Sequence, residues 1–592
     1  MGSHEDDDAV HKGRLRSIWT HTVDISRLQG QQQQGQAQQQ QHGRAYSPPG
    51  SPSKAFISSA AAQALLPGMR TPGGWCLLGR LDREVLCNAL ACAGASMADP
   101  LMSMVDTYFS GQLGTTALAA LGSNGALFSV MYFLCFTALA VLCTQAMASA
   151  NSRGDAEGVG RGFLQALAAT AVVAVLLVTL LLLLPEQLLG FFQTNAEVMP
   201  YAKTYCMIRA LSLPAALAMN VCQAAFRSLL DLSTPFAVVM AANAANYALD
   251  SLLMLRLGWG MAGCGIASVV SQYIGAGLFA AIIVRRRHQF GIPEALARAA
   301  DRAEEAQQQQ QQQQQSSSSC EAAAGKQQLW WRRLRSLFSQ QQQPRLRLKP
   351  QPVPGHYSKL PRLQPPSSTV QRLLLLLASL EWRAFVGRFL GMSLRGLLIL
   401  STYSTASMVA ARAGTASLAA HQVVQQQQQL QMSFAWSFLH VGQSMTANVF
   451  HAAPAAGGGP RAARRLATRI VRWAAVSCAV LAMLTYHNRQ LLSGLFTRDA
   501  AVRRLVGGAV APATIMLGLA WNNALEGCLL GADDQPFVVK VYPYAVAAAL
   551  LQLGRAWLRG LGLPGVWWGL VGYYLVLLAG FGGRFFVLRG RI

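Results

Sequence analysis

The chain has 592 residues, of which 52% are hydrophobic and 12% are charged, and its formal net charge is +24. Soluble proteins average about 25% charged residues, so this composition argues against a soluble enzyme and favours a membrane protein. The positive charge does not indicate a nucleic-acid-binding protein. Fifteen Lys or Arg residues against five acidic ones lie in one connector, Arg285 to Arg372, which leaves much of the charge in a single segment.

Residues 1–80 are of low complexity, with glutamine runs, the stretch S-P-P-G-S-P-S, and five acidic against eight basic residues. Such a segment cannot bury a hydrophobic core, and we expect it to be disordered. From about Arg44 to Arg80 it is basic and acid-poor, as a transit segment for an organelle would be. The acidic run Glu5 to Asp8 does not fit that pattern.

A helix that spans the hydrocarbon core needs about 20 mostly apolar residues, and the chain offers twelve such stretches. We therefore predict an all-α membrane protein with two six-helix lobes, residues 81–287 and 371–592. A basic Gln/Ser/Pro-rich connector, residues 288–370, joins them. The predicted spans are about 85–110, 117–150, 160–185, 198–229, 236–257, 263–285, 381–411, 418–450, 466–487, 503–530, 537–557 and 565–588.

An internal repeat supports the division into two lobes. The motif G-T-T-A-L-A-A at Gly114 to Ala120 returns as G-T-A-S-L-A-A at Gly414 to Ala420. Two further pairs of segments keep the same order and nearly the same spacing. Asp106, just before the first motif, has Ala406 as its counterpart, so the two lobes share a scaffold but differ in ionisable residues. The further pairs are Ser228 to Phe236 with Cys528 to Phe537, and Gly258 to Gly265 with Gly562 to Gly569.

The even number of spans in each half predicts that both halves point the same way, related by an axis along the membrane normal. One face then carries most of the basic loops and both termini, and we assign it to the cytoplasm or stroma. Its basic positions are Arg153, Arg161, Arg227, Arg285 to Arg287, Arg461 to Arg472 and Arg584, whereas Arg498, Arg503, Arg504, Arg555 and Arg559 fall on the opposite face.

Carboxylates within predicted spans are the main functional candidates. An ionised carboxylate at mid-membrane costs about 2.5–3.5 kcal/mol on insertion scales, and Asp106 and Asp250 both lie in spans of the first half. Asn246 precedes Asp250 by four residues and shares its helix face. Two carboxylates in one buried site can bind and release a proton near physiological pH, because burial and the neighbouring charge raise the pKa of a carboxyl group. The structural alternatives are that Asp106 caps the helix end near Gly111 and that Asp250 hydrogen-bonds to the backbone.

Other polar residues in or beside the spans have weaker functional signals. Asp99 lies two helical turns before Asp106, and Pro100 is expected to bend the helix between them. Arg395 is expected to pair with an acid, with contact to an anionic substrate as the alternative. His421 is expected to make a hydrogen bond, and Glu526 a structural salt bridge. His440 also falls in this second half.

The run Q-Q-Q-Q-Q-L-Q at Gln425 to Gln431 interrupts the eighth predicted span. Amide side chains facing lipid would be costly, so we expect the run to face a cavity or to bulge out of the helix. A genomic expansion or a misjoined gene is the alternative explanation. The eleven cysteines lack C-x-x-C spacing and are interpreted as small buried hydrophobes. The spacing therefore predicts no disulfide framework and no metal site.

Taken together, the motifs resemble those of the multidrug and toxic compound extrusion (MATE) family, most closely its DinF-like branch of bacteria and of plant and algal plastids. The resemblance covers about Leu81 to Leu588, apart from the connector and the glutamine run. Five motifs carry it: A-D-P-L-M-S-M-V-D-T-Y-F-S-G-Q-L-G-T-T-A-L-A-A-L-G, F-R-S-L-L-D-L-S-T-P, A-A-N-A-A-N-Y-A-L-D-S-L-L, L-G-W-G-M-A-G-C-G-I-A-S-V-V-S-Q and A-G-T-A-S-L-A-A-H-Q-V.

The resemblance implies an antiporter that exports small organic molecules in exchange for H⁺ or Na⁺, with two lobes alternating around a central cavity. It implies no cofactor beyond the coupling ion. The positions that match the family's cation-binding cluster are Asp106, Asn220, Asn246, Asp250 and Ser268. Asp99, Pro100, Arg395 and His421 are candidates for gating or substrate contact.

We expect a monomer in a plastid envelope, or otherwise in the plasma or vacuolar membrane, whose partners are a small organic substrate and the bilayer. A lipid-linked precursor flippase of the same superfamily is the alternative function. An intramembrane enzyme is disfavoured, because the spans contain no H-E-x-x-H or G-x-S-x-G motif.

Overall fold

The computed structural model describes residues 79–112, 115–192, 196–314, 369–454, 457–490 and 500–587. Nearly all of the predicted N-terminal region and residues 315–368 of the connector lie outside these ranges. Within them every regular element is a helix, so the predicted all-α class is confirmed.

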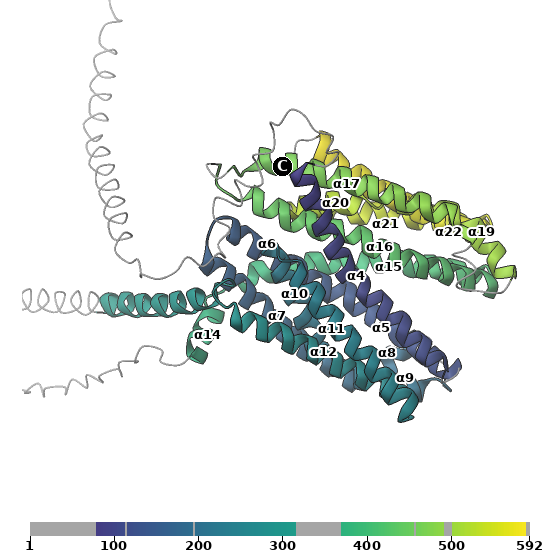
Figure 1. The fold of residues 1–592 in the computed structure, drawn as a ribbon, viewed down its shortest axis with the longest axis horizontal. Coiled ribbons are helices and arrows are strands. Elements are labelled where there is room, and N and C mark those ends of the chain that lie inside the picture. Colours follow the sequence, from purple (N-terminus) through teal and green to yellow (C-terminus); the bar gives the residue numbers. More distant parts are fainter. Residues whose placement is uncertain are drawn as a thin grey trace, which may run out of the picture. The chain divides into compact units, whose positions relative to one another are not determined.

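The first half of the described chain forms the N-lobe, drawn from purple to teal in Figure 1. Prolines begin α8, α9 and α10 at their first or second positions, where the missing N–H group costs no helical hydrogen bond. The elements are α4 (Arg80–Gln112), α5 (Thr115–Met131), η1 (Tyr132–Phe136), α6 (Thr137–Ser152), α7 (Ala156–Leu183), α8 (Pro185–Phe191), α9 (Met199–Ala210), α10 (Leu213–Ser228), α11 (Ser233–Asp250), η2 (Ser251–Arg256) and α12 (Gly260–Arg285).

The second half forms the C-lobe, drawn from green to yellow in Figure 1. A short helix at the end of the connector and the start of the C-lobe, α14, packs against α7 of the N-lobe. The elements are α14 (Thr369–Ala378), α15 (Trp382–Arg412), α16 (Thr415–Phe450), α17 (Pro460–His487), α19 (Ala500–Leu519), α20 (Asn522–Gly531), α21 (Gln535–Leu558), α22 (Gly562–Gly582) and η4 (Gly583–Val587).

Nine helices in the described residues are long and apolar enough to cross a membrane, or ten if the bent pair α9 and α10 is one span. Each of the twelve predicted spans falls on a helix or on consecutive helices. The two predicted spans outside this set fall on α4 and α16, which have 33 and 36 residues. The chain is a multi-pass membrane protein.

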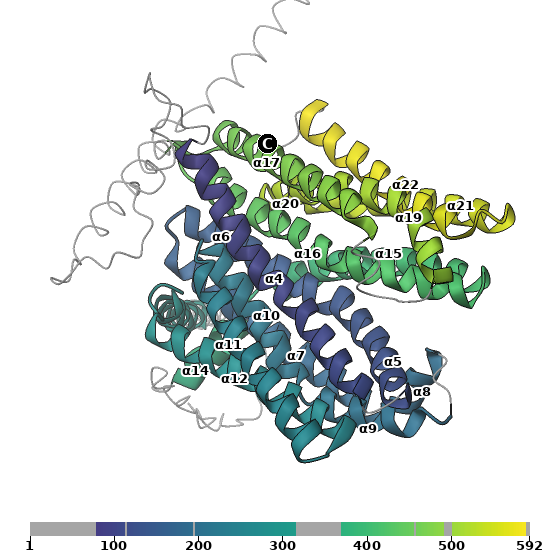
Figure 2. The same cartoon turned by 45° about the vertical axis from the view of Figure 1, so that its right-hand side comes forward.

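The first helix, α4, packs in both lobes (Figure 2). Its beginning contributes Val85, Ala89 and Cys92 to a core made mainly of C-lobe residues. Near its end, Phe109 belongs to an N-lobe core cluster with Tyr205. Pro100 lies inside the helix between these two regions. A single helix therefore connects the packing of one lobe to that of the other.

The repeat is visible in the backbone as well as in the sequence. Leu230 and Asp533 both have a φ of 61°, a left-handed conformation that side chains other than glycine rarely adopt. They occupy corresponding turns, the first between α10 and α11 and the second between α20 and α21. Both lobes thus use the same strained turn at the same point of the repeat.

Hydrogen bonds join the lobes at the end where the predicted basic loops lie. Asn151 Nδ2 donates to Asn448 Oδ1 at 2.9 Å, and Asn448 Nδ2 donates to the Ser228 carbonyl at 2.9 Å. Deeper in the protein, Gln145 donates to the Leu530 carbonyl and Gln443 donates to the Val141 carbonyl, at 2.8 and 2.9 Å. The two lobes are closed against each other at this basic end.

The glutamine run forms part of the continuous helix α16 and does not bulge out. Gln427, Gln428 and Gln431 line a small cavity between α16, α17 and α19 with a volume of about 10 Å³, close to the minimum that holds one water molecule. Gln428 Nε2 donates to the Ala513 carbonyl at 2.6 Å, and Gln431 Nε2 to Thr485 Oγ1 at 2.7 Å. The expectation that the run faces a cavity holds for these three side chains, whereas Gln426 and Gln429 are exposed.

Candidate functional site

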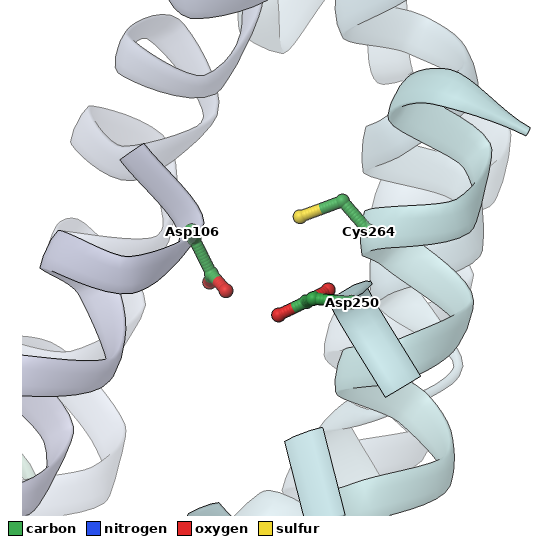
Figure 3. Close-up of side chains that lie close together, drawn as sticks. All are labelled: Asp106, Asp250 and Cys264. Atoms are coloured by element: carbon green, nitrogen blue, oxygen red, sulfur yellow. The ribbon is translucent and has the colours of Figure 1, made fainter. Parts of the chain in front are cut away.

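Two predicted carboxylates meet inside the N-lobe. Asp106 on α4 and Asp250 at the end of α11 are 6% and 0% exposed, and with the Cys264 sulfur on α12 their ligand atoms all lie within 4.8 Å of one another. The three side chains point toward one another from separate helices (Figure 3). One oxygen of each carboxylate, Oδ1, has no hydrogen-bond partner among the described residues.

A chain of hydrogen bonds orients Asp250. Asn246, one helical turn earlier, donates through Nδ2 to Asp250 Oδ2. Ser271 on α12 donates to Asn246 Oδ1 at 2.8 Å, which fixes the amide so that its nitrogen faces the carboxylate. All three residues are buried. Side chains of α11 and α12 therefore orient Asp250, while Asp106 approaches it from α4.

The local backbone explains how these side chains come together. Directly after Asp250 the helix continues as the π-helix η2, and such segments often occur at functional sites. Gly263 lets α12 approach η2 closely, because a Cβ there would lie 3.1 Å from the Leu253 carbonyl carbon. The next residue, Cys264, is thus brought close to Asp250.

A positive charge lies within electrostatic range of the carboxylates. Arg209, at the end of α9, interacts electrostatically with Asp106 and Asp250, and its guanidinium carbon lies 5.8 Å from the centre of the Phe128 ring. Tyr205, one turn earlier on the same helix, is buried in the core cluster that contains Cys264. Here α9 and α10 meet at a bend of 52°.

The remaining predicted members of the cluster have fewer contacts. Asn220 on α10 and Ser268 on α12 each have a side-chain oxygen that is buried without a hydrogen-bond partner among the described residues. Ser268 instead contributes its carbonyl, which accepts from Ser271 at 3.0 Å. Asp99 belongs to α4, and its side chain lies outside the described part of the structure.

In the C-lobe the expected ion pair is confirmed. Arg395 Nε donates to Glu526 Oε1 at 2.6 Å, and the Tyr542 hydroxyl donates to Glu526 Oε2 at 2.8 Å. His421 also behaves as predicted, since its Nε2 lies 3.1 Å from Ser407 Oγ. These contacts give Arg395 and His421 structural partners away from the N-lobe carboxylates.

Sequence reasoning missed four residues around the site: Tyr205, Arg209, Cys264 and Ser271. Cys264 and Ser271 had a usable signal, because they lie four residues before and three after Ser268, on the same face of one helix. Arg209 was also visible, as a charged residue inside the predicted span 198–229. Nothing in the sequence indicated that it would face the carboxylates.

Comparison with known proteins matches the MatE family model to residues 91–252, which include Asp106 and Asp250. The chain is 29% identical over 209 residues to Protein DETOXIFICATION 44, chloroplastic, of Arabidopsis thaliana, over 33% of this chain and 40% of that protein. The match thus spans less than half of that relative. Protein DETOXIFICATION 45, chloroplastic, of the same plant is 23% identical over 530 residues, 85% of this chain and 78% of the relative.

The fold also matches a solved structure. It aligns with an outward-facing multidrug resistance MATE family transporter of the MOP superfamily at a TM-score of 0.63 and 15% identity, over 90% of this chain and 98% of that one. At this identity the likeness shows the fold alone, and the fold is that of two lobes of membrane-spanning helices.

Proposed function

This chain carries a MATE family domain and has the fold of MATE transporters, and we propose that it is a secondary active antiporter. It exports a small organic molecule, a xenobiotic or a metabolite, in exchange for H⁺ or Na⁺. The observation that carries the proposal is the meeting of Asp106 and Asp250, two buried carboxylates from different helices within the membrane-spanning part of one lobe.

Two carboxylates in this position need a cation. An ionised carboxyl group inside a membrane protein is expensive unless it is paired, and each of these has a buried oxygen without a partner among the described residues. Arg209 offsets one negative charge. A proton or a single monovalent cation offsets the other, so its arrival and departure change the charge of the site between zero and minus one.

We infer that α4 couples ion binding in the N-lobe to the arrangement of the two lobes. Asp106 lies in the part of α4 that packs in the N-lobe, whereas the first turns of the helix pack on α16 and α17 of the C-lobe. An ion that draws Asp106 toward Asp250 therefore pulls on a helix held by both lobes, and Pro100 is the point where that helix can bend. Ion binding thereby biases the alternation of the lobes.

The names of relatives support the proposed substrate class and membrane. The names of the two Arabidopsis relatives describe detoxification proteins of the chloroplast, and the structural neighbour is a multidrug transporter. We infer export of small organic compounds across a plastid envelope by a monomer. These names favour efflux over the alternative of a lipid-linked precursor flippase.

The test is transport by the purified chain in proteoliposomes. An imposed pH gradient should drive uptake of a fluorescent organic cation, and Asp106→Asn and Asp250→Asn should each reduce it to the level of empty vesicles. Glu305→Gln, which changes an exposed carboxylate in the connector, is the matched control and should keep the wild-type rate. Replacing the pH gradient by a Na⁺ gradient identifies the ion.

Wild-type rates in both aspartate variants would reject the site. Flipping of a lipid-linked sugar without transport of any organic cation or anion would reject the antiporter in favour of the flippase.

A further inference from the structure

The thiol of Cys264 has no part in the antiport cycle described above, yet it forms the third corner of the site. It is fully buried, and its sulfur lies within 4.8 Å of carboxylate oxygens of both Asp106 and Asp250. Figure 3 shows the sulfur and the two carboxylates directed at the same space from three helices.

Two of the three side chains have an oxygen whose lone pairs are available to a ligand. Asp106 Oδ1 and Asp250 Oδ1 are buried and lack hydrogen-bond partners among the described residues. Carboxylate oxygen together with thiolate sulfur is a ligand set that suits Zn²⁺ and its chemical relatives. Two carboxylates without a sulfur ligand suit harder cations instead.

We propose that Asp106, Asp250 and Cys264 form a binding site for one thiophilic divalent cation of the Zn²⁺ or Cd²⁺ type. In tetrahedral sites the metal–oxygen distance is about 2.0–2.2 Å and the metal–sulfur distance about 2.3 Å. Neighbouring ligand atoms are then about 3.5 Å apart. Because the three ligand atoms already lie within 4.8 Å of one another, each pair has to approach by at most about 1.3 Å. A solvent molecule completes the fourth position.

The net charge of the buried site explains why the ionisation of Cys264 determines whether the site binds a divalent or a monovalent cation. Binding of the metal displaces the coupling proton or monovalent ion from the carboxylates and the proton from the thiol, and both are released to solvent. The two carboxylates and the thiolate then carry three negative charges, which the metal and Arg209 together balance. A monovalent ion reaches the same balance with the thiol still protonated. Without the thiolate, a divalent ion leaves one uncompensated positive charge inside the membrane, which is costly.

A bound metal would also act as a clamp. It joins α4 to α11 and α12 at the point where the proposed cycle requires α4 to move, so the metal should inhibit transport. This consequence rests on the proposed function, whereas metal binding itself does not.

The test uses Cd²⁺ and the purified full-length chain in detergent micelles. Binding is followed by the ultraviolet sulfur-to-cadmium charge-transfer band and by competition with a chelator. Cys264→Ser should remove one equivalent of the band and weaken binding by at least about tenfold, the smallest loss expected when a metal site loses even an outer-shell partner. Asp106→Asn should weaken binding similarly while Cys264 is still present.

Cys206→Ser is the matched control, because Cys206 is equally buried in the same core cluster but outside the three-residue site. It should leave the Cd²⁺ affinity unchanged. Equal affinity in the wild type, Cys264→Ser and Asp106→Asn would overturn the proposal and assign any band to other cysteines. A measurement on the unaltered chain guards against misfolded variants: crystals soaked in Cd²⁺ should show an anomalous peak among the three side chains, and its absence overturns the proposal.

Transport assays separate the two proposals. If Cd²⁺ binds as predicted but no ion gradient drives transport, the metal site stands and the antiporter fails. If Asp106→Asn abolishes transport while Cd²⁺ binds neither variant nor wild type, the antiporter stands and the metal site fails.

Discussion

Arg395 and Glu526 place two opposite charges in the interior of the C-lobe, where they are 7% and 1% exposed. The guanidinium also lies over the Tyr542 ring, 4.9 Å from its centre. Removing one partner of a buried ion pair leaves the other charge without compensation, which typically costs about 3–5 kcal/mol. Replacing both with apolar residues of similar volume avoids that cost.

We therefore expect Arg395→Met and Glu526→Leu each to lower the free energy of unfolding by about 3–5 kcal/mol. The double variant with Arg395→Met and Glu526→Leu should recover most of the loss. Denaturation of the purified proteins in one detergent measures this. Additive losses in the double variant would show that the two side chains do not compensate each other.

Asp231, in the turn between α10 and α11, gives the stability an acid dependence. Burial acts to raise the pKa of its carboxyl group, but hydrogen bonds from Thr234, Ser233 and Arg286 outweigh burial and hold the pKa below its usual value. A lowered carboxyl pKa contributes stability at pH values above the unfolded pKa, about 3.9. That contribution is lost as the pH falls through the lower folded-state pKa.

We expect Asp231→Asn to lower the melting temperature at neutral pH and to flatten its decline between about pH 5 and pH 2. Melting curves of the wild type and the variant across this range test it. Glu305→Gln, at an exposed position, is the control. A decline of unchanged steepness in Asp231→Asn would assign the acid dependence to other groups.

At the scale of elements, α4 is anchored at its start as well as at Asp106. Asp82 is 6% exposed and contacts three side chains of α17. It accepts from Trp473 Nε1 at 2.9 Å, from Arg469 at 3.2 Å and from Arg472 at 3.3 Å. Hydrogen bonds to charged groups contribute about 1.5–3 kcal/mol each, although solvent screens the more exposed Arg472.

Asp82→Asn should therefore loosen α4 from α17 and separate the lobes at the basic end. Spin labels at Arg83→Cys and Arg461→Cys, both exposed positions, report the distance between these helices. We expect a longer and broader distance distribution in Asp82→Asn than in the labelled parent. An unchanged distribution would mean that hydrophobic packing alone holds the start of α4.

The helices themselves were largely predictable, because the bilayer imposes a length and an apolar composition that a single sequence displays. Breaks within spans were harder to predict. The span predicted at 198–229 divides into α9 and α10, and only the proline at position 214 signalled it. The partners of Asp106 were less accessible still, since local periodicity does not determine which helices from distant parts of the chain pack together.

For the whole molecule, the repeat predicted two lobes with different chemistry, and packing shows the physical basis of the difference. Ala406, the counterpart of Asp106, is fully buried in the C-lobe core. The C-lobe instead keeps its charges in the closed pair of Arg395 and Glu526. The free carboxylate oxygens, and with them the proposed ion coupling, belong to the N-lobe.

The basic end is where the lobes meet through corresponding residues of the repeat. The segments around Gln145 and Asn151 on α6 and around Gln443 and Asn448 on α16 resemble each other, and each asparagine reaches the opposite lobe. Alternating access requires these contacts to break. A covalent link across them should therefore hold the basic end closed and stop transport.

We expect a cleavable thiol cross-linker between Asn151→Cys and Asn448→Cys to abolish gradient-driven transport, and its cleavage to restore it. Among the described residues the native cysteines other than Cys87 are buried, and Cys76 and Cys320 lie outside the described residues. A background with Cys76→Ser, Cys87→Ser and Cys320→Ser is therefore suitable. Each single cysteine variant treated with the same reagent controls for its chemical effects. Mass spectrometry must show the link in most molecules. Undiminished transport by linked protein would mean that substrate crosses without opening of this end, and the rocking of the two lobes would then have to be abandoned as the transport mechanism.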